Sequence, residues 1–190
     1  MTEQKPTEQT RTTFSEEDAI LRSKSDPKAF RPLYEAYFKR IFLFVLHRVG
    51  DKELAADLTQ QVFLNALSNI GKYQFRGLPF ASWLFRIAVN QYTDFFRKTK
   101  KMRTVVLEDS NIRELYEDLT EEQSWVEWER KLPGVLEHLS PKDLQLIELR
   151  YFERRPFKEV SEIMGLTETN TKVRAYRILD KMKKIFLQQK

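Results

Sequence analysis

Polar and aromatic side chains are concentrated in residues 75–97, in a pattern that could bind single-stranded nucleic acid. A row of side chains three or four residues apart would share one face of a helix, and its members are Arg86, Asn90, Asp94 and Arg97. The same stretch holds the aromatic residues Phe75, Phe80, Phe85, Tyr92, Phe95 and Phe96. Rings can stack on bases, an amide can hydrogen-bond to a base edge and cations can hold phosphates. A core helix with one solvated face is the alternative explanation of this pattern.

A second candidate site lies near the C-terminus. A short helix over 157–164, a turn containing Gly165 and a long basic helix over 168–186 have the order of a helix-turn-helix. Ser161 lies four residues before the glycine, where the helices would cross and only a small side chain fits. Arginine and lysine can read guanine edges or hold phosphates. The side chains expected to point away from the helix-turn-helix core are Asn170, Lys172, Val173, Arg174 and Arg177. A solvated basic face on an ordinary helical hairpin remains the alternative.

The elements that must position these residues are helices throughout. Apolar residues at spacings of three and four predict helices over 29–49 and 51–71, with Gly50 and Gly71 at their ends. A further helix contains Trp83, and others begin near Ser15 and after Ser140. Residues 1–14 have almost nothing to bury and are predicted to be disordered. We therefore predict an all-α protein of two helical domains.

Charge is segregated along the chain. The net formal charge is −2 over residues 1–23, +9 over 24–107, −7 over 108–130 and +5 over 131–190. Two basic bodies joined by an acidic segment suggest two contacts with a polyanion. The segment 104–130 is predicted to be a flexible acidic linker. A soluble tether is favoured over the alternative, a short helix packed on the second body.

Composition argues against several classes of protein. The 190 residues include no cysteine and only two histidines, His47 and His138, so a disulfide framework or zinc site is not expected. No Gly-rich phosphate loop or nucleophile constellation occurs, which argues against an enzyme or a bound cofactor. The N-terminus lacks the apolar core of a signal peptide, and the longest apolar run is residues 41–46. A cytoplasmic protein is therefore expected.

Residues 75–97 read FRG…F..WL..IA.N…D..R, and this pattern resembles the promoter-melting segment of bacterial sigma factors. The likeness is to the small extracytoplasmic-function (ECF) group of the sigma-70 family. The C-terminal sequence FKEVSEIMGLT followed by NTKVRAYR is similar to the family's helix-turn-helix. Ser161 stands where the family usually has alanine. Thr171 stands where it usually has valine, and this is expected to weaken one core contact.

The resemblance implies a role for each part of the chain. Residues 1–23 would be an N-terminal segment with a short helix, and 24–103 a region 2 domain that docks on polymerase and melts the −10 element. Residues 104–130 would be the linker and 131–188 a region 4 domain that recognises the −35 element. The −10 contacts would be Phe75, Arg76, Arg86, Asn90, Arg97, Lys98, Lys100 and Lys101. The −35 contacts would be Asn170, Lys172, Val173, Arg174 and Arg177.

A third set of residues follows from the D-L-x-Q-x-x-F order beginning at Asp57. It is similar to the segment of sigma factors that docks on the clamp coiled coil of RNA polymerase, and it makes Asp57, Gln60, Gln61 and Phe63 polymerase contacts. The resemblance thus implies a sigma factor whose partners are core RNA polymerase, promoter DNA and an anti-sigma factor. The alternative is a helix-turn-helix regulator whose first domain senses a signal and does not bind core polymerase.

Overall fold

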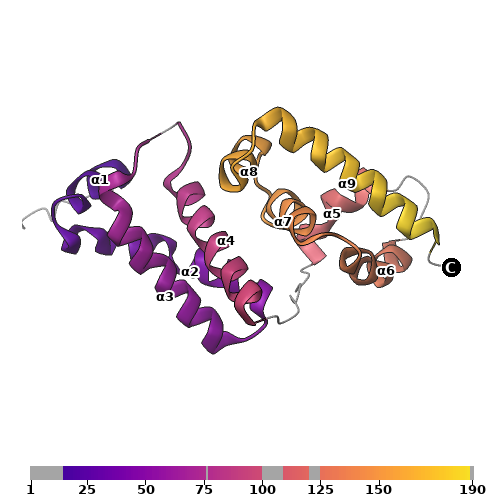
Figure 1. The fold of residues 1–190 in the computed structure, drawn as a ribbon, viewed down its shortest axis with the longest axis horizontal. Helices are drawn as coiled ribbons and strands as arrows, with labels where there is room; N and C mark the ends of the chain where they lie inside the picture. The colour runs from indigo at the N-terminus through magenta and orange to yellow at the C-terminus, as the bar shows by residue number, and fades with distance from the viewer. Residues whose placement is uncertain (1–14, 76, 100–108, 120–124, 189–190) are drawn as a thin grey trace, which may run out of the picture.

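The computed structural model describes residues 15–75, 77–99, 109–119 and 125–188, and within these ranges every regular element is a helix (Figure 1). The described residues up to 99 form one helical body, and the described residues from 109 onward form a second. Among the described residues, each helix is too short or too polar to span a lipid bilayer. The predicted all-α architecture of two helical domains is confirmed.

The N-terminal body is built on three long helices. Its elements are α1 (Glu16–Ser23), the 3-10 turn η1 (Pro27–Phe30), α2 (Arg31–Val49), α3 (Lys52–Asn69), the 3-10 turn η2 (Ile70–Lys72) and α4 (Phe80–Thr99). Side-chain caps set their starts: the Leu54 N–H donates to Asp51 Oδ1 at 2.8 Å, and the Lys28 N–H to Asp26 Oδ1 at 2.9 Å. Gly50 ends α2 in the left-handed region at φ 69°.

Rings from α2 and α4 fill the centre of this body. The Phe44 and Phe85 rings meet edge to face with centroids 4.6 Å apart, and Phe80 and Tyr92 are equally buried. The expectation that the aromatics of residues 75–97 are displayed for bases is therefore wrong for Phe80, Phe85 and Tyr92. The apolar side of α4 is wide, because the helix packs on α2, α3 and α8 (Phe157–Met164). Phe75, in contrast, is 69% exposed.

The C-terminal body contains α5 (Asp109–Leu119), α6 (Trp125–Glu137), α7 (Pro141–Ile147), the π-helical turn η3 (Glu148–Phe152), α8 (Phe157–Met164) and α9 (Glu168–Gln188). Gly165 between α8 and α9 has φ 68°, and the Leu166 N–H donates to the Ser161 carbonyl at 2.8 Å. This is the predicted helix-turn-helix. Its glycine adopts the left-handed conformation that side chains with a Cβ rarely take.

The described part of 104–130 is packed on the C-terminal body. On α5, Glu114 pairs with Arg150, and Asp118 accepts a hydrogen bond from the Tyr151 hydroxyl at 2.8 Å. Burial and the hydrogen bond with Asp118 both raise the pKa of Tyr151. Trp128 of α6 is fully buried. Of the two alternatives for this segment, the structure has the helix packed on the second body.

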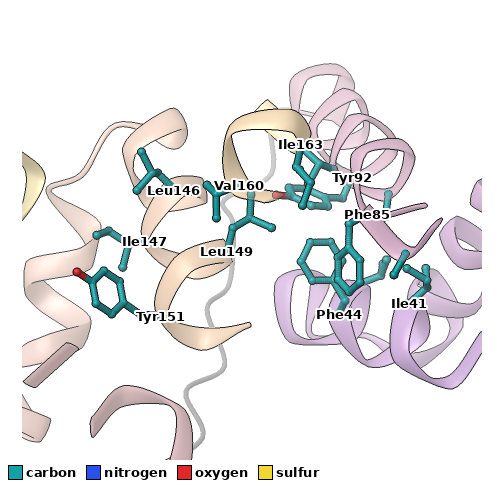
Figure 2. Packing of buried hydrophobic residues seen from close by; sticks show 14 of the residues in the cluster. Ile41, Phe44, Phe85, Tyr92, Leu146, Ile147, Leu149, Tyr151, Val160 and Ile163 are labelled. Carbon is teal, nitrogen blue, oxygen red and sulfur yellow. The ribbon is translucent and has the colours of Figure 1, made fainter. Parts of the chain in front are cut away.

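The two bodies also pack against one another, which the sequence did not predict. Val160 and Ile163 of α8 point toward Phe85 and Tyr92 of α4, as Figure 2 shows. These residues belong to one hydrophobic cluster that continues from the first body into the second. Helix α8 therefore packs on α9 and η3 of its own body and on α4 of the other.

The aromatic cluster around Trp128 provides a test of where the second body begins. The Trp128 ring contacts Tyr116 of α5 at 5.3 Å and Phe186 of α9 at 5.9 Å between centroids. We expect Trp128→Ala to lower the free energy of unfolding of the C-terminal body by about 3–5 kcal/mol, measured by urea denaturation followed by circular dichroism. The matched control is Val126→Ala, two residues away and 74% exposed, which should change it by less than about 0.5 kcal/mol. Equal effects would mean that α6 starts outside the core.

Candidate nucleic-acid and protein interfaces

The polar face of α4 borders a hollow of about 490 Å³ that is shared with α3. Asn90 lies on its rim with Arg86 and Gln91 from the same helix, and Trp83 forms part of its wall. Two amides of α3, Asn65 and Asn69, complete it together with Lys72. Amides can pair with base edges, and cations attract phosphates. The hollow therefore combines the groups that a flipped-out base would need.

A smaller hollow of about 140 Å³ adjoins it beneath the loop that precedes α4. It shares Lys72, Trp83 and Arg86 with the first hollow and adds Tyr73, Leu78 and Pro79. Gly77 turns this loop with φ 69°. The loop thus provides an apolar edge beside the cationic and amide groups of α4.

An apolar groove of about 720 Å³ runs between α2 and α3. Phe63 forms part of its floor, only 4% exposed, with the Tyr34 ring at 4.9 Å between centroids. Asp57 and Gln60 stand on the α3 side, and Leu64 remains 51% exposed. A groove with an apolar floor and a polar rim suits the apolar face of a helix from a partner protein.

The outer face of α9 carries the third surface. Asn170, Lys172, Val173 and Arg177 are exposed. Thr171, which stands where the family usually has valine, is fully buried. Its hydroxyl donates a hydrogen bond to the Thr167 carbonyl at 2.9 Å, so this buried hydroxyl has a hydrogen-bond partner.

Arg174 is held by a carboxylate of α7. Its Nε and Nη2 both donate to Asp143 Oδ1, at 2.9 and 2.8 Å. Burial acts to raise the pKa of Asp143, but the hydrogen bonds from Ser140 and Arg174 outweigh it and lower that pKa below its usual value. The carboxylate therefore stays ionised and fixes the guanidinium on the helix-turn-helix surface.

Comparison with known proteins identifies both bodies. The family model "Sigma-70 region 2" matches residues 33–102, and "Sigma-70, region 4" matches residues 129–182. The ECF RNA polymerase sigma factor SigM of Bacillus subtilis is 30% identical over 155 residues, which cover 81% of this chain and 93% of SigM. The chain belongs to the ECF sigma factors. As a sigma factor it directs transcription initiation, with core RNA polymerase and promoter DNA as its partners. Because each body matches a sigma-70 region, the alternative of a regulator with a sensor domain is wrong.

Other relatives agree with this family. BldN of Streptomyces coelicolor, an ECF RNA polymerase sigma factor, is 30% identical over 151 residues, 78% of this chain and 57% of BldN. The solved structure of CnrH in complex with the cytosolic domain of CnrY has a TM-score of 0.58 at 16% identity, and covers 91% of this chain and 97% of CnrH. The sigma factor RpoE in complex with the anti-sigma factor NepR, from Bartonella quintana, has a TM-score of 0.56 at 16% identity, and covers 85% of this chain and 98% of RpoE. The last two show the same fold.

Four of the eight predicted −10 residues lie on α4. Arg86, Asn90, Arg97 and Lys98 are all exposed along α4. Arg97 pairs with Asp94 at 3.1 Å. Arg76, Lys100 and Lys101 lie outside the described residues.

The predicted polymerase residues divide between two faces of α3. Asp57, Gln60 and Phe63 line the apolar groove, whereas Gln61 does not and donates instead to Asn65 Oδ1 at 3.2 Å. Sequence reasoning did not select Asn65 and Asn69 as partners of Asn90. Asn65 and Asn69 are four residues apart, a spacing that places them on one polar face of α3. That spacing could not show that α4, which carries Asn90, is the helix beside this face.

Proposed function

We propose that this sigma factor captures a melted −10 base in the hollow beside Asn90, docks on core polymerase through the α2–α3 groove and reads the −35 element with α9. The observation that carries the proposal is the meeting of Asn90, Asn65 and Asn69 around one hollow with Arg86 and Trp83. The protein would contribute recognition, and RNA synthesis would remain the chemistry of the polymerase. Residues 24–103 and 131–188 would be the two functional domains.

The −10 hollow would stabilise a base that has left the duplex. Unstacking a base costs a few kcal/mol, and stacking on an aromatic ring contributes about 1–3 kcal/mol per base. The exposed ring of Phe75, the indole of Trp83 and the amide of Asn90 are the groups that would offset that cost. Arg97 and Lys98 lie about two turns further along α4, where they would contact the backbone of the same strand.

The α2–α3 groove would take the partner helix of the polymerase by its apolar side. Phe63 provides the floor, and Asp57 and Gln60 would fix the orientation of the partner through polar contacts at the rim. The exposed Leu64 and Tyr34 would become buried in the complex. This groove opens on α2 and α3, whereas the −10 hollow opens on α3 and α4, so both can be occupied together.

Helix α9 would lie in the major groove of the −35 element. Asn170 and Lys172 lie in its first turns, where recognition helices contact base edges. Arg174 is oriented by Asp143 before any DNA is bound, which reduces the entropy lost on contact. Two DNA contacts joined by one chain gain from effective concentration, so neither domain needs to bind promoter DNA tightly on its own.

An anti-sigma factor is included among the proposed partners. The solved structures of CnrH and of RpoE each contain a second protein, the cytosolic domain of CnrY and the anti-sigma factor NepR. A regulator of that class would have to cover one of the three surfaces described above.

The groove assignment predicts that Asp57→Ala combined with Gln60→Ala weakens binding to core polymerase about tenfold, because polar contacts at a desolvated rim are lost. Affinity is measured by fluorescence anisotropy of labelled sigma factor titrated with bacterial core polymerase. Gln61→Ala is the matched control, since Gln61 adjoins Gln60 in sequence but lies outside the groove. Wild-type affinity in the double variant would place the docking surface elsewhere.

The −10 assignment predicts that Asn90→Ala reduces open-complex formation about 10- to 100-fold, the discrimination expected of a lost amide–base contact. Binding to core polymerase should be unchanged. Permanganate footprinting of the melted strand measures the first quantity and anisotropy the second. Thr93→Ala, an exposed residue of the same helix, is the control. Normal melting by Asn90→Ala would remove this residue from the site.

The −35 assignment predicts that Arg174→Ala costs about 1–3 kcal/mol of binding to the preferred −35 duplex and relaxes the preference at one position. Asp143→Asn should show part of that loss, because the guanidinium is no longer fixed. Lys184→Ala, further along α9, is the control for the change of charge. Holoenzyme binding to a library of −35 duplexes measures all three. An equal loss by Arg174→Ala on every sequence would make Arg174 a phosphate contact.

A further inference from the structure

Helix α1 lines neither the two hollows nor the apolar groove of the first body. A helix of eight residues is unstable by itself in water, so its contacts with neighbouring elements must stabilise it. Ala19 and Ile20 are buried, and the helix packs on η1, α2 and η2. Figure 1 shows α1 at the end of the body where α3 leads into the loop before α4. Helix α1 therefore lies beside the loop that borders the −10 hollow.

A lysine at the end of α1 holds the first residue of this loop. Lys24 Nζ donates to the carbonyl oxygen of Tyr73 at 3.0 Å, across 49 positions of the sequence. Tyr73 directly follows η2, and its N–H donates to the Ile70 carbonyl at 3.0 Å. A hydrogen bond from a charged ammonium group is stronger than one between neutral groups. Both backbone polar groups of Tyr73 are thus bonded, which fixes the point at which the chain enters the loop.

A glutamate at the start of α1 makes a second attachment close by. Glu16 accepts a hydrogen bond from the Tyr37 hydroxyl of α2. Burial and this hydrogen bond raise the pKa of Tyr37, and burial together with the charge of Glu16 raises the pKa of Tyr73. The carboxylate of Glu16 therefore acts on the two tyrosines together, and it ties α1 to α2 beside Tyr73.

The two tyrosines belong to a cluster of four rings at the base of the loop. The Tyr73 ring lies 5.2 Å from Phe80 and 5.0 Å from Trp83 between centroids. Phe80 in turn lies 5.4 Å from Trp83 and 5.8 Å from Tyr37. Aromatic pairs at such distances stabilise one another beyond the area that they bury. Trp83 is also the wall shared by both hollows, so a displacement of Tyr73 would displace that wall.

We propose that α1 positions the loop before α4 and the wall of the −10 hollow. Lys24 and Glu16 are positioning residues, because they act through the two tyrosines and touch no base. A site that is ordered before DNA arrives loses less entropy when it captures a base. Release of α1 would leave only a fraction of the molecules competent, and affinity for the melted strand falls in proportion to that fraction. The functional part of the inference rests on the proposed −10 site, whereas the anchoring of the loop can be measured without DNA.

Anchoring is tested by hydrogen exchange of the full-length protein, followed by mass spectrometry. Lys24→Met removes the ammonium group and keeps a long unbranched side chain, so the amides of residues 70–82 should exchange about three- to tenfold faster. Lys24→Arg keeps a cation at this place and should restore most of the protection. Lys39→Met, at an exposed lysine of α2, is the matched control for the loss of one charge. Unchanged exchange in Lys24→Met would overturn the proposal.

Tyr37→Phe tests the attachment at Glu16 separately. The substitution removes the hydroxyl and keeps the ring, so the aromatic cluster is preserved. Exchange of residues 70–82 should rise about two- to threefold, while residues 52–66 of α3 keep the wild-type rate in every variant. Wild-type exchange at 70–82 would remove Glu16 from the anchor. Faster exchange throughout α3 would mean a general loss of stability instead of release of the loop, and would overturn the proposal.

The consequence for DNA is tested in holoenzyme assembled with bacterial core polymerase. Lys24→Met should reduce open-complex formation about three- to tenfold in permanganate footprinting, with unchanged affinity for core polymerase in the anisotropy titration. Lys24→Arg should recover most of the melting, and Lys39→Met should melt the promoter normally. A loosened loop with normal melting by Lys24→Met would overturn the functional part of the proposal.

A double-mutant cycle separates positioning from a direct contact of Lys24 with DNA. Lys24→Met should add little to the loss caused by Trp83→Leu, because both disturb the same wall. Its effect should add fully to that of Arg97→Ala, which lies farther along α4. Additive losses with both partners would show that Lys24 acts elsewhere, and would overturn the proposal. Failure of the −10 site itself would be seen independently, as normal melting by Asn90→Ala.

Discussion

The position of α4 between three helices is the constraint on which the rest of the structure depends. Leu84, Phe85 and Ala88 are fully buried against α2 and α3 and, through Phe85, against the second body. Only a narrow face is left for solvent, and it carries Arg86 and Asn90. Because burial of the apolar side stabilises the helix, the residues of the narrow face need not contribute to stability and can serve recognition. The site is accordingly carried by a rigid helix, which suits precise contacts with a base.

Electrostatics distinguishes the two faces of the second body. Toward solvent, α9 presents Lys172 and Arg177, as expected for contact with a polyanion. Toward the first body, η3 and α8 present Glu148, Glu159 and Glu162. The same domain is thus basic where it would meet DNA and acidic where it meets a basic domain. The net charge of a segment hides this division, because opposite signs on opposite faces cancel.

The sequence predicted what is decided locally. Helix ends followed from caps such as Asp51 and from Gly50 and Gly165, whose conformations depend on a few neighbouring residues. It did not predict the pairing of Arg48 with Glu153, which lie 105 residues apart, nor the meeting of Asn65 with Asn90. Helical periodicity shows which face is apolar but not which helix covers it. For that reason the sequence placed the polar row of α4 on one exposed face, but it could not show that Gln61, predicted as a polymerase contact, lies outside the groove that its neighbour Gln60 lines.

Two of the arginines proposed to face DNA, Arg174 and Arg86, are held by carboxylates from other helices, and these carboxylates differ in origin. Asp143 belongs to the same body as Arg174, so that clamp persists whether the domains are together or apart. Glu162 reaches Arg86 from the other body, so that contact exists only when the domains are together. The clamp on Arg174 is therefore internal to the C-terminal body, whereas the contact of Arg86 depends on the packing of the two bodies.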